Sequence, residues 1–152
     1  MFNKKRILAV VMARGGSKGI KNKNLKKINL KSLVAISGQL LKKVKKIDES
    51  IISTDSKKIA LEAEKNHLNF HFLRPKKISG DRVSDLKVIN HSLKFMEKFR
   101  NQKFDIVLII QPTSPMRKAK EIFNCIKIAS KKNVTSCWTV NEVSLKFHPY
   151  KQ

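Results

Sequence analysis

The sequence predicts an α/β fold, built from a mostly parallel sheet with helices on both faces. Three observations lead to this prediction: short apolar runs rich in β-branched residues, longer stretches with apolar residues at helical spacing, and a regular alternation of the two along the chain. The 152 residues are enough for a domain with a buried core, and no repeat or long linker divides them. We therefore expect residues 1–152 to form a single domain.

Five segments have the composition of strands. Residues 7–13 form a continuous apolar and β-branched run, which is typical of a strand buried on both faces. Residues 50–55 are a shorter run that ends in a polar pair, and residues 68–73 alternate apolar and polar side chains. Residues 104–110 repeat the pattern of the first run, and residues 134–140 are expected to be the last strand.

Helices are expected between these strands because apolar residues recur there every three or four positions, with lysines on the other side. Ser56 and Ser84 stand at the start of two of them and are candidate N-caps. In sheets of this kind, ligands bind beyond the carboxyl ends of the strands, so the loops there are where we expect a site. The expected helices span residues 32–47, 56–67, 84–99 and 119–132.

The chain is strongly basic, with a formal net charge of +23. Only six of its 34 basic residues are arginines, although arginine is preferred for bidentate contacts with bases and phosphates. Aromatic residues make up 7% of the chain, and no basic block has aromatics interleaved for stacking on bases. The composition therefore argues against nucleic acid as a partner, while the positive charge favours the capture of small anions.

The sequence offers no sign of a membrane segment. No apolar run reaches about 18 residues, and no small-residue cleavage site follows the first apolar run, as a signal peptide requires. Cys125 and Cys137 have neither a CxxC spacing nor a nearby histidine partner. We expect a cytoplasmic protein with two reduced thiols.

A glycine-rich loop directly follows the first expected strand. Gly15, Gly16 and Gly19 leave room for backbone N–H groups to turn toward an anion. The spacing matches neither the P-loop GxxxxGK[ST] nor the dinucleotide motif GxGxxG. From these residues alone, a phosphate-binding loop and a plain glycine turn are equally open. The loop also carries polar and cationic side chains, namely Arg14, Ser17, Lys18, Lys21 and Lys23.

Further motifs follow in a fixed order and favour the phosphate-binding interpretation. Together they resemble the acylneuraminate cytidylyltransferase family, the CMP-sialic acid synthetases, from residue 6 to the end of the sequence. Relatives that activate legionaminic, pseudaminic or related acids share the pattern. The motifs are "ARGGSKGIKNKNL" at 13–25, "IISTD" at 51–55, "FLRP" at 72–75, "SGD" at 79–81 and "QPTSPMR" at 111–117.

The resemblance implies a nucleotide-diphospho-sugar transferase fold of the Rossmann-like kind. It also implies transfer of CMP from CTP to an acidic nine-carbon sugar, an N-acylneuraminate, with Mg²⁺ as cofactor and release of pyrophosphate. Such an activity would serve lipopolysaccharide or capsule biosynthesis. Two alternatives stay open: a cytidylyltransferase for legionaminic, pseudaminic or 3-deoxy-octulosonic acid, and a non-catalytic basic domain that binds nucleotides or nucleic acid.

The resemblance also assigns roles to single positions. It implies that Arg14 and Lys23 act on the phosphates during catalysis. It places the CTP-binding role on Gly15, Gly16, Ser17, Lys18, Asn24, Arg74 and Ser84. It places the sugar-binding role on Gln111, His148 and Lys151.

Family members are considerably longer than this sequence, which is expected to be a C-terminally truncated form. We expect the acidic Mg²⁺ ligands, and the segment that reaches across a homodimer, to lie in the further part. No carboxylate of this sequence is therefore assigned to the metal.

Three residues depart from the family pattern or have two interpretations. Leu30 stands where relatives often have glycine, so the turn there must differ or be strained. Asp85 replaces a serine that commonly contacts the base. Asp55 ends the second expected strand, where it could hold a metal but is more typical of a cap on the next helix.

Overall fold

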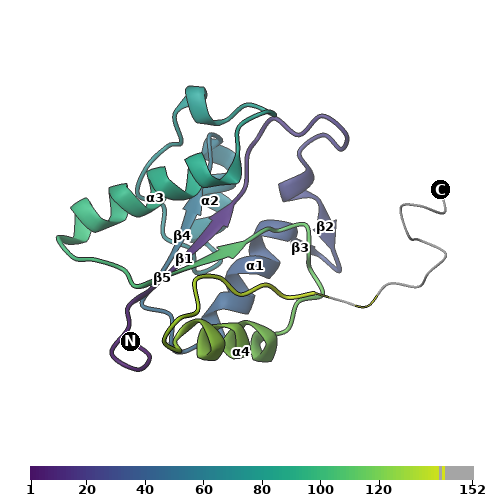
Figure 1. Ribbon diagram of the computed structural model, residues 1–152. Coiled ribbons are helices and arrows are strands. Elements are labelled where there is room, and N and C mark those ends of the chain that lie inside the picture. Colours follow the sequence, from purple (N-terminus) through teal and green to yellow (C-terminus); the bar gives the residue numbers. More distant parts are fainter. Residues whose placement is uncertain (141, 143–152) are drawn as a thin grey trace, which may run out of the picture.

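The computed structural model describes residues 1–140 and 142 and confirms the α/β fold (Figure 1). Its centre is a three-stranded parallel sheet in the order β4-β1-β5. The strands are β1 (Ile7–Met12), β4 (Glu49–Ser53) and β5 (Ile106–Ile110). The central strand β1 pairs with β4 from Leu8↔Glu49 to Met12↔Ser53 and with β5 from Ile7↔Ile106 to Val11↔Ile110.

Strand β1 is buried on both faces, as its continuous apolar run predicts. Ile7, Ala9 and Val11 contribute to one hydrophobic cluster, and Leu8 and Val10 contribute to another on the opposite face. All five side chains are fully buried. The period of two along the strand thus supplies both layers of the core from one segment.

Helices cover both faces of the sheet, as expected (Figure 1). The cluster on one face takes side chains from α1, α2 and α4, and the cluster on the other face takes Met96 from α3. The helices span α1 (Leu33–Lys42), α2 (Lys57–Glu64), α3 (Asp85–Arg100) and α4 (Ala119–Ala129). None of the helices in the described part of the chain is long and apolar enough to cross a membrane.

Helix α1 begins at a serine cap and ends earlier than its sequence pattern predicts. The Ser32 hydroxyl accepts a hydrogen bond from the Ala35 N–H at 3.0 Å, which satisfies one free donor of the first turn. Lys43 N–H bonds to the Leu40 carbonyl at 3.1 Å, so the last turn tightens and the helix stops. A Cβ on Gly38 would lie 1.9 Å from the Asn66 carbonyl oxygen, so only glycine fits where α1 meets the end of α2.

Two of the five expected strands do not form as continuous strands. Residues 68–73 lie alongside β4 but make only two isolated parallel bridges, Ile51↔Asn69 and Thr54↔Leu73. Ile51, on β4, and Thr54, just after its end, are three positions apart, whereas their partners Asn69 and Leu73 are four apart, so one extra residue breaks the ladder. Residues 134–140 are irregular; Trp138 and Val140 are exposed because this segment pairs with no strand in the described structure.

A short hairpin separates the glycine-rich loop from α1. Its strands β2 (Lys27–Ile28) and β3 (Lys31–Ser32) are antiparallel, and a short 3₁₀ helix, η1 (Lys23–Leu25), precedes them. Asn29 and Leu30 form the turn with φ of 46° and 68°, both in the left-handed region. The turn therefore keeps a conformation suited to glycine, and the strain expected at Leu30 is present.

Candidate functional site

The strand order places a crevice between the carboxyl ends of β1 and β5. Helix α1 follows β1 on one face of the sheet and α3 precedes β5 on the other, so the direction of winding reverses there. A hollow of about 300 Å³ lies at this point. It is lined by Met12, Arg14, Ser17, Lys23, Asn24, Arg74, Ile78, Gly80, Asp81, Val83, Asp85, Val88, Gln111, Pro112 and Thr113.

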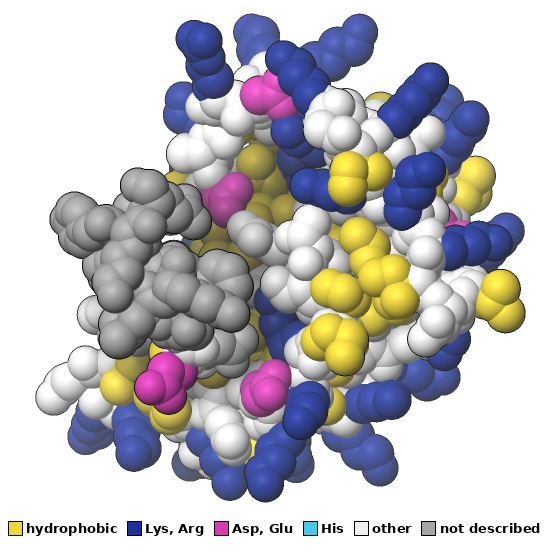
Figure 2. All heavy atoms as spheres, turned by 90° about the vertical axis from the view of Figure 1, so that its right-hand side faces the viewer, with side chains coloured by type: hydrophobic (Ala, Val, Ile, Leu, Met, Phe, Trp, Pro, Cys, Tyr) yellow, Lys and Arg dark blue, Asp and Glu magenta, His cyan; other side chains and the backbone are white. Residues whose placement is uncertain are grey.

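The arrows of β1 and β5 point toward the right-hand side of Figure 1, and Figure 2 shows that side of the molecule face on. Lys and Arg side chains surround this face, with few Asp and Glu side chains among them (Figure 2). An anion that approaches the carboxyl edge of the sheet therefore meets a positive field.

The glycine-rich loop is partly engaged and partly open. Gly15 N–H donates to Asp55 Oδ1 at 2.7 Å, and Ser17 N–H donates to the Gly15 carbonyl at 3.0 Å. A Cβ on Gly15 would lie 3.0 Å from Ser56 Cβ, so glycine lets the loop pass close to the start of α2. Gly16 has open space where a Cβ would point. The sequence predicts that backbone N–H groups of this loop turn toward an anion. Gly16 fits that prediction better than Gly15 or Ser17, whose N–H groups already bind the chain.

Asp55 does not cap α2, which corrects the interpretation from the sequence. The N-cap position is Ser56, and its side chain makes no capping hydrogen bond. The carboxylate of Asp55 instead turns to Gly15 N–H and ties the glycine-rich loop to the end of β4. The partly buried Gly15 N–H thereby gains the acceptor that it needs.

A cluster of two cations and one carboxylate lies at the rim of the hollow. Arg14 Nη1 donates to Asp81 Oδ1, and Lys18 Nζ lies 2.8 Å from Asp81 Oδ2. Hydrogen bonds from Lys18 and from Arg14 lower the pKa of Asp81, so this carboxyl is charged at neutral pH. Arg14 and Lys18, which the resemblance assigns to CTP, thus lie side by side. Between them lies the carboxylate of Asp81, to which the sequence analysis assigned no role.

The 3₁₀ helix η1 presents two of the predicted residues. Lys23 lines the hollow, and Asn24 is 95% buried behind it. Asn24 Nδ2 donates to the Arg14 carbonyl at 2.9 Å, so it holds the backbone of the glycine-rich loop in place. Its side chain thereby fixes the position from which Arg14 reaches the hollow.

Arg74 is buried at the base of the hollow. Its Nε donates to Ser53 Oγ at 3.1 Å and its Nη2 donates to the Ser53 carbonyl at 2.5 Å. Burial lowers the pKa of Arg74, the charge of Asp55 opposes that shift, and Arg14 adds to it. The hydrogen bonds to the end of β4 make this cation a fixed part of the site rather than a mobile side chain.

Gln111 follows β5 directly and pairs with the first residue of α3. Its Nε2 donates to Asp85 Oδ2 at 3.2 Å. Because a carboxylate only accepts, the amide group of Gln111 must face Asp85, which leaves its carbonyl oxygen for another donor. Ser84, the predicted neighbour of the nucleotide, occupies the N-cap of α3 and is not among the lining residues.

The remaining predicted positions add nothing to the described site. His148 and Lys151 lie outside the described residues. Residues 1–140 and 142 contain no group of three or more His, Cys, Asp or Glu side chains that could hold a metal ion. Asp81 and Asp85 are already paired with Arg14, Lys18 and Gln111, so the donors present do not fit a magnesium site by themselves.

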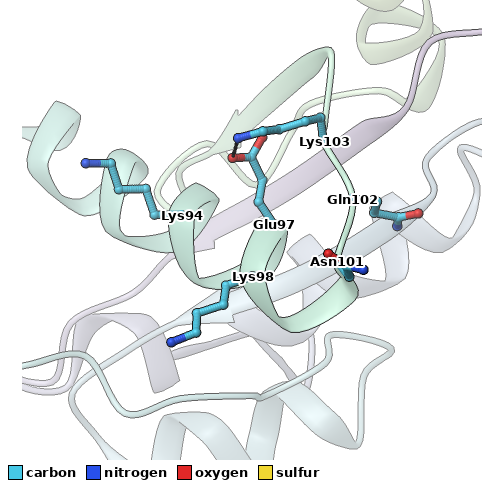
Figure 3. A pocket seen from close by; sticks show the side chains of 6 residues that line it. All are labelled: Lys94, Glu97, Lys98, Asn101, Gln102 and Lys103. Carbon is cyan, nitrogen blue, oxygen red and sulfur yellow. Dashed lines mark hydrogen bonds and ion pairs between the residues drawn. The ribbon is translucent and has the colours of Figure 1, made fainter.

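A larger hollow of about 460 Å³ lies at the opposite end of the sheet, where α3 turns into β5 (Figure 3). Lys103 pairs there with Glu97 at 2.7 Å, while Lys94 and Lys98 do not converge on a common point (Figure 3). Hydrogen bonds from Lys103 lower the pKa of Glu97. We therefore assign the site to the smaller hollow, because a ligand site needs polar groups that converge on one point.

Comparison with known proteins agrees with this geometry. A family model described as cytidylyltransferase matches residues 8–151. The chain is 36% identical over 143 residues to the CMP-N,N'-diacetyllegionaminic acid synthase of Legionella pneumophila, covering 93% of this chain and 60% of that protein. It is 30% identical over 123 residues to the N-acylneuraminate cytidylyltransferase of Escherichia coli, covering 81% of this chain and 28% of that protein.

A solved structure of CMP:2-keto-3-deoxy-manno-octonic acid synthetase, complexed with CTP, has the same fold. The TM-score is 0.63 at 18% sequence identity, over 80% of this chain and 46% of the other. The chain thus spans between 28% and 60% of the length of these proteins.

Asp81 and Asp85 line the hollow, but the sequence analysis assigned neither of them to the site. The only signal for Asp81 was its place in "SGD", a short polar stretch that precedes an amphipathic helix. That position predicts a negative charge near the start of a helix, but it does not identify the cations that pair with it.

Proposed function

The chain belongs to the cytidylyltransferase family, and from this premise we propose that it forms the CTP-binding part of an enzyme that transfers CMP to a nonulosonic acid. The N-acylneuraminates are the acceptor that the motifs suggest, with legionaminic and pseudaminic acids as alternatives within the same class. The observation that carries the proposal is that Arg14, Lys23 and Arg74 line one hollow, with Lys18 at its rim through Asp81.

The proposed chemistry is displacement at the α-phosphorus of CTP. The anomeric hydroxyl oxygen of the sugar forms a bond to the α-phosphorus and gives up its proton to solvent. The bond between the α-phosphorus and the oxygen that bridges the α- and β-phosphates breaks, so pyrophosphate leaves with that electron pair. Negative charge grows on the phosphoryl oxygens and on the leaving group, and fixed cations stabilise it without reorganising. Arg74 and Arg14 are held for this task by Ser53 and Asn24.

The proposed acceptor lies on the Gln111 side of the hollow. The amide nitrogen of Gln111 is bound to Asp85, and its carbonyl oxygen has no donor among the described residues, so it can accept a hydrogen bond from a sugar hydroxyl or an N-acyl N–H. An acidic sugar is itself an anion, so the net charge of +23 favours its capture. We also predict a homodimer and a role for Mg²⁺.

Calorimetric titration with CTP, with and without Mg²⁺, tests the proposal on wild type and on Arg14→Ala. Loss of a hydrogen-bonded charge should weaken CTP binding by roughly 10- to 100-fold. Lys94→Ala is the matched control, because it removes a cation from the hollow at the other end of the sheet. Its affinity for CTP should stay close to that of wild type.

The proposal fails if wild type binds CTP no better than Arg14→Ala does. A basic nucleic-acid-binding domain would give a different pattern, in which affinity for a polynucleotide falls steeply with salt and Arg14→Ala has no specific effect. The choice among sugars needs a panel of acidic sugars, with pyrophosphate release as the readout, on a form of the enzyme that turns over.

A further inference from the structure

The carboxylate of Asp81 holds two of the cations on which the proposed phosphate site depends. Arg14 Nη1 donates to Asp81 Oδ1, while Lys18 Nζ lies 2.8 Å from Asp81 Oδ2, so each carboxylate oxygen has its own cationic partner. Asp81 is 67 residues from Arg14 in the sequence, and the two lie on different loops. An anion that belongs to the chain therefore occupies the cations to which the proposed function assigns the phosphates.

These ion pairs are open to solvent and can exchange. The side chains of Arg14 and Asp81 are each 34% exposed, and that of Lys18 is 85% exposed. Ion pairs of this kind contribute little to stability because water and salt screen them. A ligand with more negative charge can therefore take both cations without unfolding anything around them.

The loop that carries Asp81 is loosely attached. Its backbone hydrogen bonds are local, from Ser79 N–H to the Lys76 carbonyl at 3.1 Å and from Val83 N–H to the Gly80 carbonyl at 3.4 Å. A Cβ on Gly80 would meet nothing closer than a Val83 methyl at 3.8 Å. Within the described structure, the ion pairs of Asp81 are the polar contacts that join this loop to the glycine-rich loop.

We propose that Asp81 competes with the nucleotide phosphates for Arg14 and Lys18, and so keeps weakly binding anions out of the phosphate site. The inference rests on the proposed function, in which both substrates are anions. A triphosphate brings several charges and can also reach Lys23, whereas the carboxylate of an acidic sugar brings one. Asp81 thus sets a threshold that CTP passes and that a single carboxylate does not.

Calorimetry on wild type and Asp81→Asn tests the competition with three probes: inorganic tripolyphosphate, CTP and cytidine. Removing the competitor should tighten tripolyphosphate and CTP by a common factor, about three- to tenfold, and leave cytidine unchanged. Glu64→Gln is the matched control, because Glu64 is an exposed carboxylate on α2 with no cation partner among the described residues. It should stay within about twofold of wild type for all three probes.

A second background separates direct competition from a general change in charge. In Arg14→Ala/Lys18→Ala, the partners of Asp81 are gone, so adding Asp81→Asn should produce no further gain in affinity for tripolyphosphate. A gain that persists there, or one that Glu64→Gln reproduces, overturns the competition. Asp81→Ser serves as a second neutral variant, with circular dichroism to verify that each variant is folded.

The outcomes distinguish this inference from the proposed function. Tighter binding of tripolyphosphate by Asp81→Asn, with no binding of CTP, upholds the competition and contradicts the cytidine nucleotide. Arg14-dependent binding of CTP by wild type, with no gain in Asp81→Asn, contradicts the competition alone. Failure of wild type and Asp81→Asn to bind either phosphate ligand contradicts both.

Discussion

At the amino edge of the sheet, carboxylates bind the backbone, whereas at the carboxyl edge Asp81 binds side chains. Asp48 Oδ2 accepts from Ile7 N–H at 2.8 Å and Asp105 Oδ2 accepts from Arg6 N–H at 2.7 Å, where β1 begins. Asp81 takes Arg14 and Lys18, which extend from a loop. A backbone donor beside a strand cannot leave, but a solvent-exposed cation can change partner. The carboxylates at the amino edge are therefore structural, as is Asp55, which binds Gly15 N–H at the carboxyl edge, whereas the ion pairs of Asp81 are suited to ligand exchange.

The two edges should differ most in how much the free energy of unfolding falls when one carboxylate is removed from each. Asp48→Ala leaves the fully buried Ile7 N–H without its side-chain acceptor, and we expect a loss of about 2 kcal/mol in the free energy of unfolding. Asp81→Ala removes only exposed ion pairs and should leave the urea midpoint close to that of wild type. Urea unfolding of both variants at pH 7 measures this contrast. Equal losses in the two variants would contradict the distinction between the edges.

A smaller effect should appear on acidification, in the layer between the sheet and α3. His71 Nε2 and His91 Nδ1 are buried there and have no hydrogen-bond partner among the residues that the structure describes. Burial lowers the pKa of His91, and the charge of Arg74 lowers it further. Burial also lowers the pKa of His71, where Arg100 adds to the shift while Glu49 and Glu64 oppose it. Each histidine contacts a phenylalanine ring, with centroid distances of 4.7 Å for His71–Phe99 and 4.9 Å for Phe72–His91.

The sign of the pH effect follows from these shifts. The unfolded chain takes up protons on histidine at about pH 6.5, and the folded chain does so only at lower pH. The contribution of the neutral histidines is therefore complete above about pH 6.5 and is lost as the pH falls through the folded pKa values. Urea midpoints between pH 7.5 and pH 5 should decline in wild type. His71→Phe/His91→Phe should flatten the decline, and an equally steep decline in that variant would assign it to other groups.

The sequence predicted what burial dictates and missed what depends on partners far away in the chain. Strand β1 was predicted because seven consecutive apolar residues need cover on both faces, and it is the fully buried centre of the sheet. The strand expected at 134–140 rested on an apolar pattern alone, and no neighbouring strand pairs with that segment within the described residues. A pattern of side chains indicates which residues could be buried, but it does not indicate whether a strand of the sheet has a free edge with which the segment can pair.

The same limit applies to the site. The resemblance of short motifs to a known family pointed to Lys23, Asn24, Arg74 and Gln111, and the structure brings all four to one hollow. The role of Asp81 could not be predicted, because its partners are more than 60 residues away and meet it only once α3 and β1 are packed. Asp55 was misassigned for a related reason, since its acceptor role is set by Gly15 N–H, 40 residues earlier in the chain.

The smallest expected effect concerns the hairpin beside the carboxyl edge, where stability can be gained without touching the site. Leu30 is 89% exposed and has φ of 68°, so its Cβ is strained and its side chain packs against little. Leu30→Gly should raise the free energy of unfolding by about 0.5–1 kcal/mol, because relief of strain outweighs the extra freedom of the unfolded chain. Leu30→Ala is the control, since it removes the exposed apolar side chain but keeps the Cβ. Thermal unfolding should show a higher midpoint for glycine than for alanine, with CTP affinity unchanged in both; equal midpoints would mean that the turn is not strained.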